Sequence, residues 1–206
     1  MKSIYEEMYT YKFTLLPEDK GRWLPNDVFF EKLLKECTYF NFLEIGSFTG
    51  SGSTRFLGSV AKKYQGNLFC IDKFDIPDTE ENRTLYKRFG FTFSIPDLYQ
   101  HFLSNMFHYG LEDTVKVFRG SSDNFFESKS YIGLPTLGLC YIDGNHGYEI
   151  AKRDILNCAK CFPEAVLCGD DWMYEPWRTA IQRAVTEAAK ETNKVVHSEK
   201  NFWWLS

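Results

Sequence analysis

Residues 42–53, FLEIGSFTGSGS, determine the fold that this sequence predicts. The first four residues are typical of a short buried strand, and a glycine-rich turn follows them. From residue 53 onward, Phe56, Leu57 and Val60 mark the apolar face of a helix. Glycine tolerates the tight backbone angles of such a turn, and the start of a helix offers unpaired N–H groups. The stretch therefore predicts a strand–turn–helix unit that can hold a ligand at its turn.

The rest of the chain repeats this alternation of short apolar strands and amphipathic helices. Strands are predicted at residues 68–71, 115–118, 137–142 and 165–168, helices at 29–37, 97–109, 148–162 and 177–190, and two closing strands at 195–197 and 201–204. The first five strands show little polar alternation, as expected of a sheet covered on both faces. The pattern favours an α/β fold with a mostly parallel sheet and helices on both faces.

The length of 206 residues suits a single domain that spans residues 1–206. Residues 1–25 show no clear period and are expected to form an irregular N-terminal arm. Residues 73–100 begin with a mixture of proline, charged and aromatic residues, for which we expect a loop or a lid. The aromatic side chains expected to exclude water there are Trp23, Phe89, Phe91 and Phe93.

Composition argues against several classes of protein. The net charge is −4 and no long run of Lys or Arg is present, whereas binding to a nucleic-acid backbone needs a basic face. No stretch approaches the roughly 20 apolar residues of a membrane helix, and residues 1–15 do not resemble a signal peptide. Several of the six cysteines lie in apolar strands, which indicates free thiols and a cytoplasmic location. Cys158 and Cys161 lie in a helical pattern, so we interpret them as core residues.

The carboxyl ends of the parallel strands meet at one edge of the sheet, where open α/β sheets bind ligands. Asp72 ends the second strand, and its carboxylate is placed to accept the hydroxyls of a ribose; a solvent-exposed strand end is the alternative. Ser121 and Ser122 follow the third strand and are candidates for contact with an adenine, or for a helix cap. A G-x-G-x-x-G fingerprint begins at Gly50 but fails at Arg55, which disfavours a nicotinamide dehydrogenase.

Four titratable side chains follow the fourth and fifth strands, namely Asp143, His146, Asp170 and Asp171. Clustered carboxylates repel one another unless a cation lies among them, and oxygen ligands favour Mg²⁺. We therefore predict a magnesium site formed by the three aspartates. His146, whose ordinary pKa lies near neutrality, is placed to act as general base on a substrate hydroxyl. The alternatives are helix capping and simple exposure to solvent.

Three motifs carry a resemblance to a known family. Residues 42–50 are similar to the EIG-x-x-x-G motif of the cation-dependent O-methyltransferases, which are class I S-adenosylmethionine-dependent methyltransferases. Residues 141–148, YIDGNHGY, and 168–172, CGDDW, resemble the DG-x-H-x-Y and GDD motifs of the macrocin and mycinamicin O-methyltransferase group. The resemblance extends over residues 28–190.

The resemblance implies a Rossmann-like, seven-stranded, mostly parallel sheet of order 3-2-1-4-5-7-6, with the last strand antiparallel. It assigns Gly46, Ser47 and Gly50 to the methionine part of S-adenosylmethionine and Asp72 to its ribose. The predicted cofactor site also includes Glu44, Ser121, Ser122 and Asp143. Asp143, Asp170 and Asp171 bind Mg²⁺ in this assignment, His146 and Asp143 are the catalytic pair, and Trp172 and Tyr174 contact the acceptor.

We therefore predict an S-adenosylmethionine-dependent enzyme that, with Mg²⁺, methylates a hydroxyl of a small molecule of sugar or phenol type. One alternative is metal-independent methyl transfer to another nucleophile, which metal dependence of activity would exclude. Another is a non-catalytic S-adenosylmethionine-binding domain, which loss of function in His146→Ala would exclude. No membrane or nucleic-acid partner is predicted, and the sequence leaves the oligomeric state open.

Overall fold

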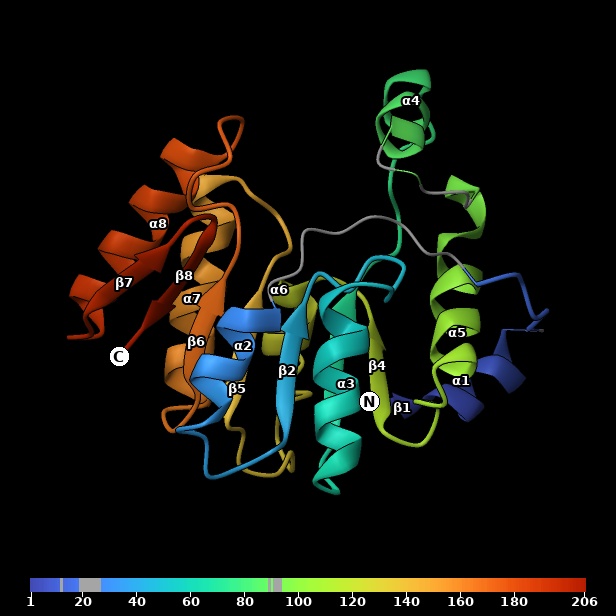
Figure 1. Cartoon of the computed structure of the whole chain (residues 1–206), viewed down its shortest axis with the longest axis horizontal. Coiled ribbons are helices and arrows are strands. Elements are labelled where there is room, and N and C mark those ends of the chain that lie inside the picture. The colour runs from blue at the N-terminus through green and yellow to red at the C-terminus, as the bar shows by residue number, and fades with distance from the viewer. Residues whose placement is uncertain (12, 19–26, 89, 91–93) are drawn as a thin grey trace.

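A mostly parallel sheet runs through the centre of the protein (Figure 1). The computed structural model describes residues 1–11, 13–18, 27–88, 90 and 94–206. Within them the strands are β1 (Lys2–Ser3), β2 (Phe42–Ile45), β3 (Leu68–Asp72), β4 (Val115–Arg119), β5 (Leu139–Ile142), β6 (Val166–Gly169), β7 (Val196–Glu199) and β8 (Phe202–Leu205). The helices are α1 (Ile4–Thr10), α2 (Asp27–Leu34), α3 (Ser53–Lys63), α4 (Glu80–Arg88), the 3₁₀ helix η1 (Ile95–Asp97), α5 (Leu98–His108), α6 (Ser122–Glu127), α7 (Tyr148–Cys161) and α8 (Arg178–Glu191).

The order of the strands confirms the predicted α/β sheet. It is β1-β4-β3-β2-β5-β6-β8-β7, with β2 to β6 mutually parallel and β8 antiparallel to both of its neighbours. Leaving out β1 and numbering the others along the chain gives 3-2-1-4-5-7-6. The sheet in the described residues has eight strands where seven are predicted, because β1 pairs antiparallel with β4 and becomes the edge strand.

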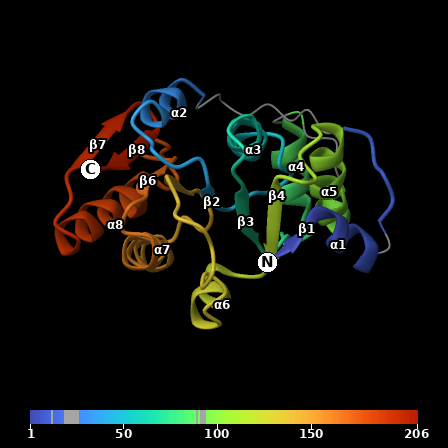
Figure 2. The same cartoon turned by 90° about the horizontal axis from the view of Figure 1, so that it is seen from below.

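Helices cover both faces of the sheet, as predicted (Figure 2). Helices α2, α3 and α5 pack on one face, and α6, α7 and α8 pack on the other. Side chains of β2 alternate between the two layers: Phe42 belongs to the first core, whereas Leu43 and Ile45 belong to the second. Because both faces of the sheet are covered, all four residues of β2 are buried. The alternation places Glu44 on the face that α3 covers.

Residues 2–10 of the predicted irregular arm form regular secondary structure. It contains β1 and α1, and Ser3 caps α1: its hydroxyl accepts the N–H of Glu6 at 3.3 Å, while the Glu6 carboxylate accepts the N–H of Ser3 at 2.7 Å. This reciprocal pair is a capping box, which the spacing Ser-x-x-Glu signals. Glu7 then accepts a hydrogen bond from the Tyr99 hydroxyl of α5 at 2.5 Å, which attaches α1 to α5.

The segment predicted to be a loop or lid contains α4 and η1. Figure 1 shows α4 beyond the edge of the sheet, apart from the helices that pack on it. None of the residues of α4 is buried. Its Tyr86 ring lies 5.1 Å from the ring of Phe48, which is in the glycine-rich turn. Phe89, Phe91, Phe93 and Trp23 lie outside the described residues.

Two further predictions concern membranes and cysteines. In the part of the chain that the structure describes, no helix is long and apolar enough to cross a membrane. All six cysteines are free. Cys158 is a buried core residue of α7, and Cys161 ends the same helix, so the C-x-x-C spacing is part of a helix as the sequence indicates.

Asp154 is an unusual component of the second core. It lies on α7, its exposed fraction is 1%, and neither carboxylate oxygen makes a regular hydrogen bond with a described residue. Burial raises the pKa of its carboxyl group to about 6, although the nearby Ser122 hydroxyl opposes the shift. The folded state therefore prefers the protonated form. This preference stabilises the fold fully below about pH 4, and the stabilisation is lost as the pH rises through about 6.

Replacing Asp154 with asparagine should remove this pH dependence. Relative to the wild type, the free energy of unfolding of Asp154→Asn is expected to rise by about 2 kcal/mol between pH 4 and pH 7. Urea denaturation at a series of pH values measures the difference. Asp113→Asn, at an exposed position, is the matched control and should follow the wild type. Parallel profiles for Asp154→Asn and the wild type would show that the buried carboxyl does not titrate in this range.

Candidate active site

The turn after β2 is held between the ends of β3 and β5. The N–H of Gly46 donates to the carbonyl of Ile71 at 2.9 Å, and the N–H of Asp143 donates to the carbonyl of Ile45 at 2.8 Å. Both hydrogen bonds extend the parallel pairing of β2 with β3 and with β5 by one residue beyond the strand ends. The three strand ends therefore bring the predicted cofactor and metal residues to one edge of the sheet.

Two glycines of the turn lie where a side chain has no room. Gly46 has φ +92°, and an added Cβ would lie 2.1 Å from the carbonyl oxygen of Asp143. Gly50 has φ +73°, and an added Cβ would lie 2.5 Å from Cε of Met106 in α5. Gly46 thus lets the turn approach β5, and Gly50 lets α5 pack on the turn. Both glycines contribute to the shape of the predicted cofactor site through these approaches.

Glu44 joins the glycine-rich turn to α3. Its carboxylate is fully buried and accepts hydrogen bonds from the hydroxyls of Ser53 at 2.6 Å and Thr54 at 2.5 Å, both at the start of α3. Burial raises its pKa to about 7, against the opposing effect of these hydroxyls. Ser47 is buried beside Glu44 and Cys70. The Glu44 carboxylate is therefore directed to the start of α3, where it ties the turn to this helix.

Asp72 lies at the end of β3, next to the turn. Its two oxygens accept the backbone N–H groups of Phe48 at 2.9 Å and Phe74 at 2.7 Å. Burial raises the pKa of its carboxyl group, and these two hydrogen bonds oppose the shift. Each carboxylate oxygen has about two lone-pair sites, so Asp72 keeps acceptor capacity for the hydroxyls of a ribose. The remaining acceptor capacity of the Asp72 carboxylate is compatible with the predicted binding of a ribose.

The two serines after β4 lie at the start of α6. Ser121 is its N-cap: its hydroxyl accepts the N–H of Asn124 at 3.1 Å and donates to the side-chain carbonyl oxygen of Asn124 at 2.9 Å. Ser122 is buried close to Asp154. The helix-cap interpretation of Ser121 is therefore correct, and it leaves contact with an adenine as a prediction.

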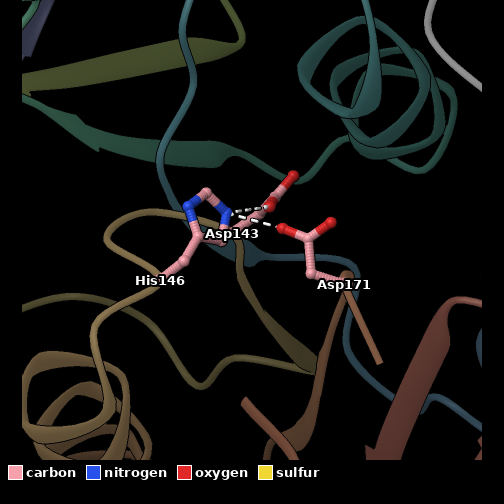
Figure 3. A group of neighbouring side chains, drawn as sticks. All are labelled: Asp143, His146 and Asp171. Carbon is pink, nitrogen blue, oxygen red and sulfur yellow. Dashed lines mark ion pairs between the residues drawn. The ribbon is translucent and has the colours of Figure 1, made fainter. Parts of the chain in front are cut away.

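Two carboxylates and one imidazole converge at the ends of β5 and β6 (Figure 3). Nε2 of His146 lies 2.7 Å from Oδ2 of Asp171 and 3.5 Å from Oδ1 of Asp143. One ligand atom of each residue lies within 4.8 Å of the other two. Tyr141 donates a hydrogen bond to the other oxygen of Asp143 at 3.0 Å. The side chains are only 14–28% exposed, so the group forms a partly sheltered site.

Among the described residues, the third predicted metal ligand, Asp170, does not belong to the group of Asp143, His146 and Asp171. Its backbone carbonyl accepts the indole N–H of Trp203 at 3.0 Å, and its side-chain Oδ1 is shielded from solvent. Asp171 adopts φ +64°, which is uncommon for a residue other than glycine. The structure thus brings together Asp143 and Asp171, with His146 as the third member of the group.

The charged forms of His146 and of the two carboxylates stabilise one another. Burial lowers the pKa of His146, but the hydrogen bonds to Asp143 and Asp171 outweigh this effect and raise the pKa to about 10. Burial also raises the pKa of Asp143, although His146 opposes that shift. Two carboxylates and a nitrogen at this spacing fit a divalent cation: the oxygens suit Mg²⁺, and the imidazole adds a ligand that transition metals favour.

Aromatic residues of the segment between β6 and α8 border the group. Trp172 donates its N–H to the carbonyl of Asn201 at 2.8 Å and packs on the second core, while Tyr174 is 41% exposed. Trp177 stacks on the ring of His146 and was missed by sequence reasoning. The only available signal was an aromatic residue at the start of the helix that follows the two aspartates.

Comparison with known proteins identifies the family. The model of a methyltransferase domain matches residues 43–172, which is more than half of the chain. By sequence, no curated protein matches the chain significantly.

Three solved structures illustrate the similarity of the fold. The O-methyltransferase TomG from Streptomyces achromogenes, in complex with S-adenosylmethionine, is 14% identical with a TM-score of 0.57, over 98% of this chain and 86% of that chain. An O-methyltransferase from Bacillus cereus in complex with S-adenosylhomocysteine is 15% identical with a TM-score of 0.57, over 98% and 88%. The TDP-rhamnose 3′-O-methyltransferase CalS11 is 14% identical with a TM-score of 0.54, over 87% and 75%.

The strand order, the glycine-rich turn and the acidic sheet edge define an S-adenosylmethionine-dependent methyltransferase of class I. The chain belongs to the family of methyltransferase domains whose model matches residues 43–172.

Proposed function

We propose that the protein transfers the methyl group of S-adenosylmethionine to a hydroxyl of a small molecule of sugar or phenol type, assisted by Mg²⁺ or a similar divalent cation. The observation that carries this proposal is the convergence of Asp143, His146 and Asp171 at the sheet edge that also holds the glycine-rich turn. The group offers ligands for a cation and a base for a hydroxyl, beside the predicted cofactor site.

Each residue of the group has a role in this reaction. When bound, S-adenosylmethionine supplies an electrophilic methyl group, and the cation lowers the pKa of the acceptor hydroxyl. Asp143 and Asp171 would hold the cation with their carboxylates. His146 would accept the hydroxyl proton at Nε2 in its neutral form, while the acceptor oxygen bonds to the methyl carbon and the carbon–sulfur bond breaks. The neutral form requires that a cation take over the carboxylates whose hydrogen bonds raise the pKa of His146 to about 10. The largest contribution of the fold is the alignment of these groups.

The cofactor site is proposed at the turn itself and at the end of β3. Gly46, Ser47 and Gly50 lie against the methionine part in this proposal, and Asp72 binds the ribose. Ser121 and Ser122 are proposed near the adenine, because β4 is the neighbour of β3 in the sheet. Glu44 contributes through the start of α3, to which both of its oxygens are bonded.

We propose that residues 73–100 form a lid within a single domain of residues 1–206. Helix α4 has nine residues, none of them buried, and reaches the turn through the contact of Tyr86 with Phe48. A helix of this length is marginally stable in water by itself. A cofactor bound at Asp72 would give α4 a further surface to pack on.

The names of similar solved structures support the proposed chemistry. TomG and the Bacillus cereus protein are O-methyltransferases, and CalS11 is named for TDP-rhamnose. The DG-x-H-x-Y and GDD motifs support membership of the macrocin and mycinamicin O-methyltransferase group. Trp172 and Tyr174 are the proposed acceptor contacts. The free thiols support a cytoplasmic location.

The test is formation of S-adenosylhomocysteine from S-adenosylmethionine by the full chain, with catechol or TDP-rhamnose as acceptor. We expect turnover with Mg²⁺, loss of turnover in EDTA, and recovery when Mg²⁺ is restored. Turnover that EDTA does not change would establish the metal-independent alternative. Binding of S-adenosylhomocysteine without turnover of any sugar or phenol would support the non-catalytic alternative.

Replacing Asp72 with alanine should weaken binding of S-adenosylhomocysteine about 10- to 100-fold, because hydrogen bonds to a charged carboxylate contribute about 1.5–3 kcal/mol. Calorimetric titration measures this change, and thermal melting checks the fold. Asp75→Ala, at an exposed position of the same segment, is the control and should bind like the wild type. Wild-type affinity in Asp72→Ala would remove the ribose assignment.

Tyr86→Ala, in the proposed lid, should weaken binding of S-adenosylhomocysteine by a smaller factor than Asp72→Ala.

A further inference from the structure

The imidazole of His146 has a contact that involves neither carboxylate. Its ring stacks on the indole of Trp177, with centroids 5.1 Å apart and planes 13° apart. The backbone of Trp177 is fixed at the start of α8, since its N–H donates to the carbonyl of Tyr174 at 2.9 Å and its carbonyl accepts the N–H of Ile181 at 3.0 Å. The stack therefore connects His146 to a separate element of the fold.

The loop that carries His146 shapes the backbone, and the ring itself contacts Asp143, Asp171 and Trp177. His146 lies between β5 and α7 and is flanked by Asn145 and Gly147. The side-chain oxygen of Asn145 accepts the N–H of Gly147 at 2.8 Å, which turns the backbone. The two side-chain torsions of His146 remain to be set by contacts of the ring itself.

The contacts of the His146 ring are of two kinds, because the ion pairs with the carboxylates engage Nε2 and the stack on Trp177 does not. The contacts with Asp171 at 2.7 Å and Asp143 at 3.5 Å both use this atom. In the proposed reaction Nε2 accepts the acceptor's proton, so these contacts must change when an acceptor is bound. The contact with Trp177 uses the face of the ring. It can persist whatever Nε2 is bonded to.

We propose that Trp177 is a positioning residue of the reaction: it holds the plane of the His146 ring so that Nε2 stays directed at the space between Asp143 and Asp171. The inference rests on the proposed function, in which His146 is the base. Stacked aromatic pairs stabilise their geometry beyond simple burial. The indole thus replaces the orienting effect of the carboxylates once these engage a cation or an acceptor.

The chain offers a matched control for this contact. His197 of β7 stacks on Trp204 of β8 with centroids 5.2 Å apart and planes 12° apart, the same arrangement as at the site. Trp204 lies beside α2, where Lys32 approaches its ring at 5.1 Å. Changing Trp177 and Trp204 separately, each to alanine and to phenylalanine, distinguishes loss of a stack from loss of the stack at the site.

The first measurement is the proton–carbon spectrum of the imidazole groups of the four histidines. A stacked indole shifts ring-proton signals upfield. Trp177→Ala should remove this shift and increase ring mobility for His146 alone, and Trp204→Ala should do the same for His197 alone. Trp177→Phe should retain most of the effect, because a phenyl ring still stacks.

The second measurement is kinetic, with catechol or TDP-rhamnose as acceptor. In Trp177→Ala, kcat is expected to fall about 3- to 10-fold while the KM for S-adenosylmethionine stays unchanged, and Trp177→Phe should restore kcat to within about twofold. Both Trp204 variants should retain wild-type kcat.

The outcomes separate this inference from the proposed function. An unchanged His146 spectrum in Trp177→Ala would overturn the inference, as would a relaxed ring with unchanged kcat. A wild-type enzyme that binds S-adenosylhomocysteine but methylates no acceptor would remove the proposed function. In that case the spectra still decide whether Trp177 holds the ring.

Discussion

Replacing Asp143 with asparagine is expected to lower kcat/KM for methyl transfer about 10²–10³-fold, the range for removal of one preorganised electrostatic group. The Asp143 carboxylate lies 3.5 Å from Nε2 of His146 and accepts a hydrogen bond from Tyr141. The amide has nearly the same shape but no charge, so in the proposed site the cation would lose a charged ligand while the fold is kept. Initial rates at increasing Mg²⁺ concentrations measure the effect, and the half-saturating concentration should rise.

The same assay ranks the two aspartates after β6. Asp171→Asn should match the loss in Asp143→Asn, because Asp171 belongs to the group with His146. Asp170→Asn should lose less activity than either variant, because Asp170 does not belong to the group with His146. Glu199→Gln, a surface carboxylate paired with Lys32, is the control and should behave like the wild type. The opposite ranking of Asp170 and Asp171 would assign the metal to the residue that the structure places outside the group.

Replacing Gly46 with alanine should lower the free energy of unfolding by about 3–5 kcal/mol, measured by urea denaturation. Two effects add: a side chain at φ +92° is strained, and its Cβ would lie 2.1 Å from the carbonyl oxygen of Asp143. Relief of the clash would separate β2 from β5 at the site. The folded fraction of the variant should therefore also bind S-adenosylhomocysteine less tightly.

Gly133→Ala isolates the first of these effects. Gly133 has φ +86°, but no atom of a described residue lies within 4 Å of an added Cβ. Its substitution should cost only the conformational strain, about 1–2 kcal/mol. Equal losses at the two positions would mean that the ends of β2 and β5 move apart freely, and that the close approach at Gly46 is not needed for stability.

The central sheet is predictable because its parallel strands lie in the core of the protein. β2, β3, β5 and β6 are almost entirely buried, whereas β4 buries only its first and third residues. The strands therefore form short, mostly apolar segments whose boundaries are the glycines and aspartates of the sheet edge. The helices between them show a clear apolar period for the same reason. Parallel strands joined through helices then leave few possible orders.

The elements that sequence reasoning missed lack an apolar pattern. β1 has two residues, and α1 has seven, which is shorter than the window in which a helical period is visible. Only the capping box of Ser3 and Glu6 signalled α1. α4 buries no residue, so no side of it is constrained to be apolar.

The site was predictable as a convergence but not in its detail. Topology places the ends of β5 and β6 side by side, which brings Asp143, His146 and the two later aspartates into one region. Which of Asp170 and Asp171 faces His146 depends on the left-handed backbone at Asp171, and no local pattern encodes it. The contact with Trp177 joins residues 31 positions apart and follows from tertiary packing alone.

The closing hairpin determines when the site can form during synthesis. Asn201, between β7 and β8, accepts the N–H groups of Trp172 and Met173 and reaches Asp171 with its amide at 3.5 Å. The turn that presents Asp171 is thus built against residues made some thirty positions later. A nascent chain that has already folded β2 to β6 should bring Asp171 to His146 only once residues 201–205 have left the ribosome, because β8 inserts between β6 and β7.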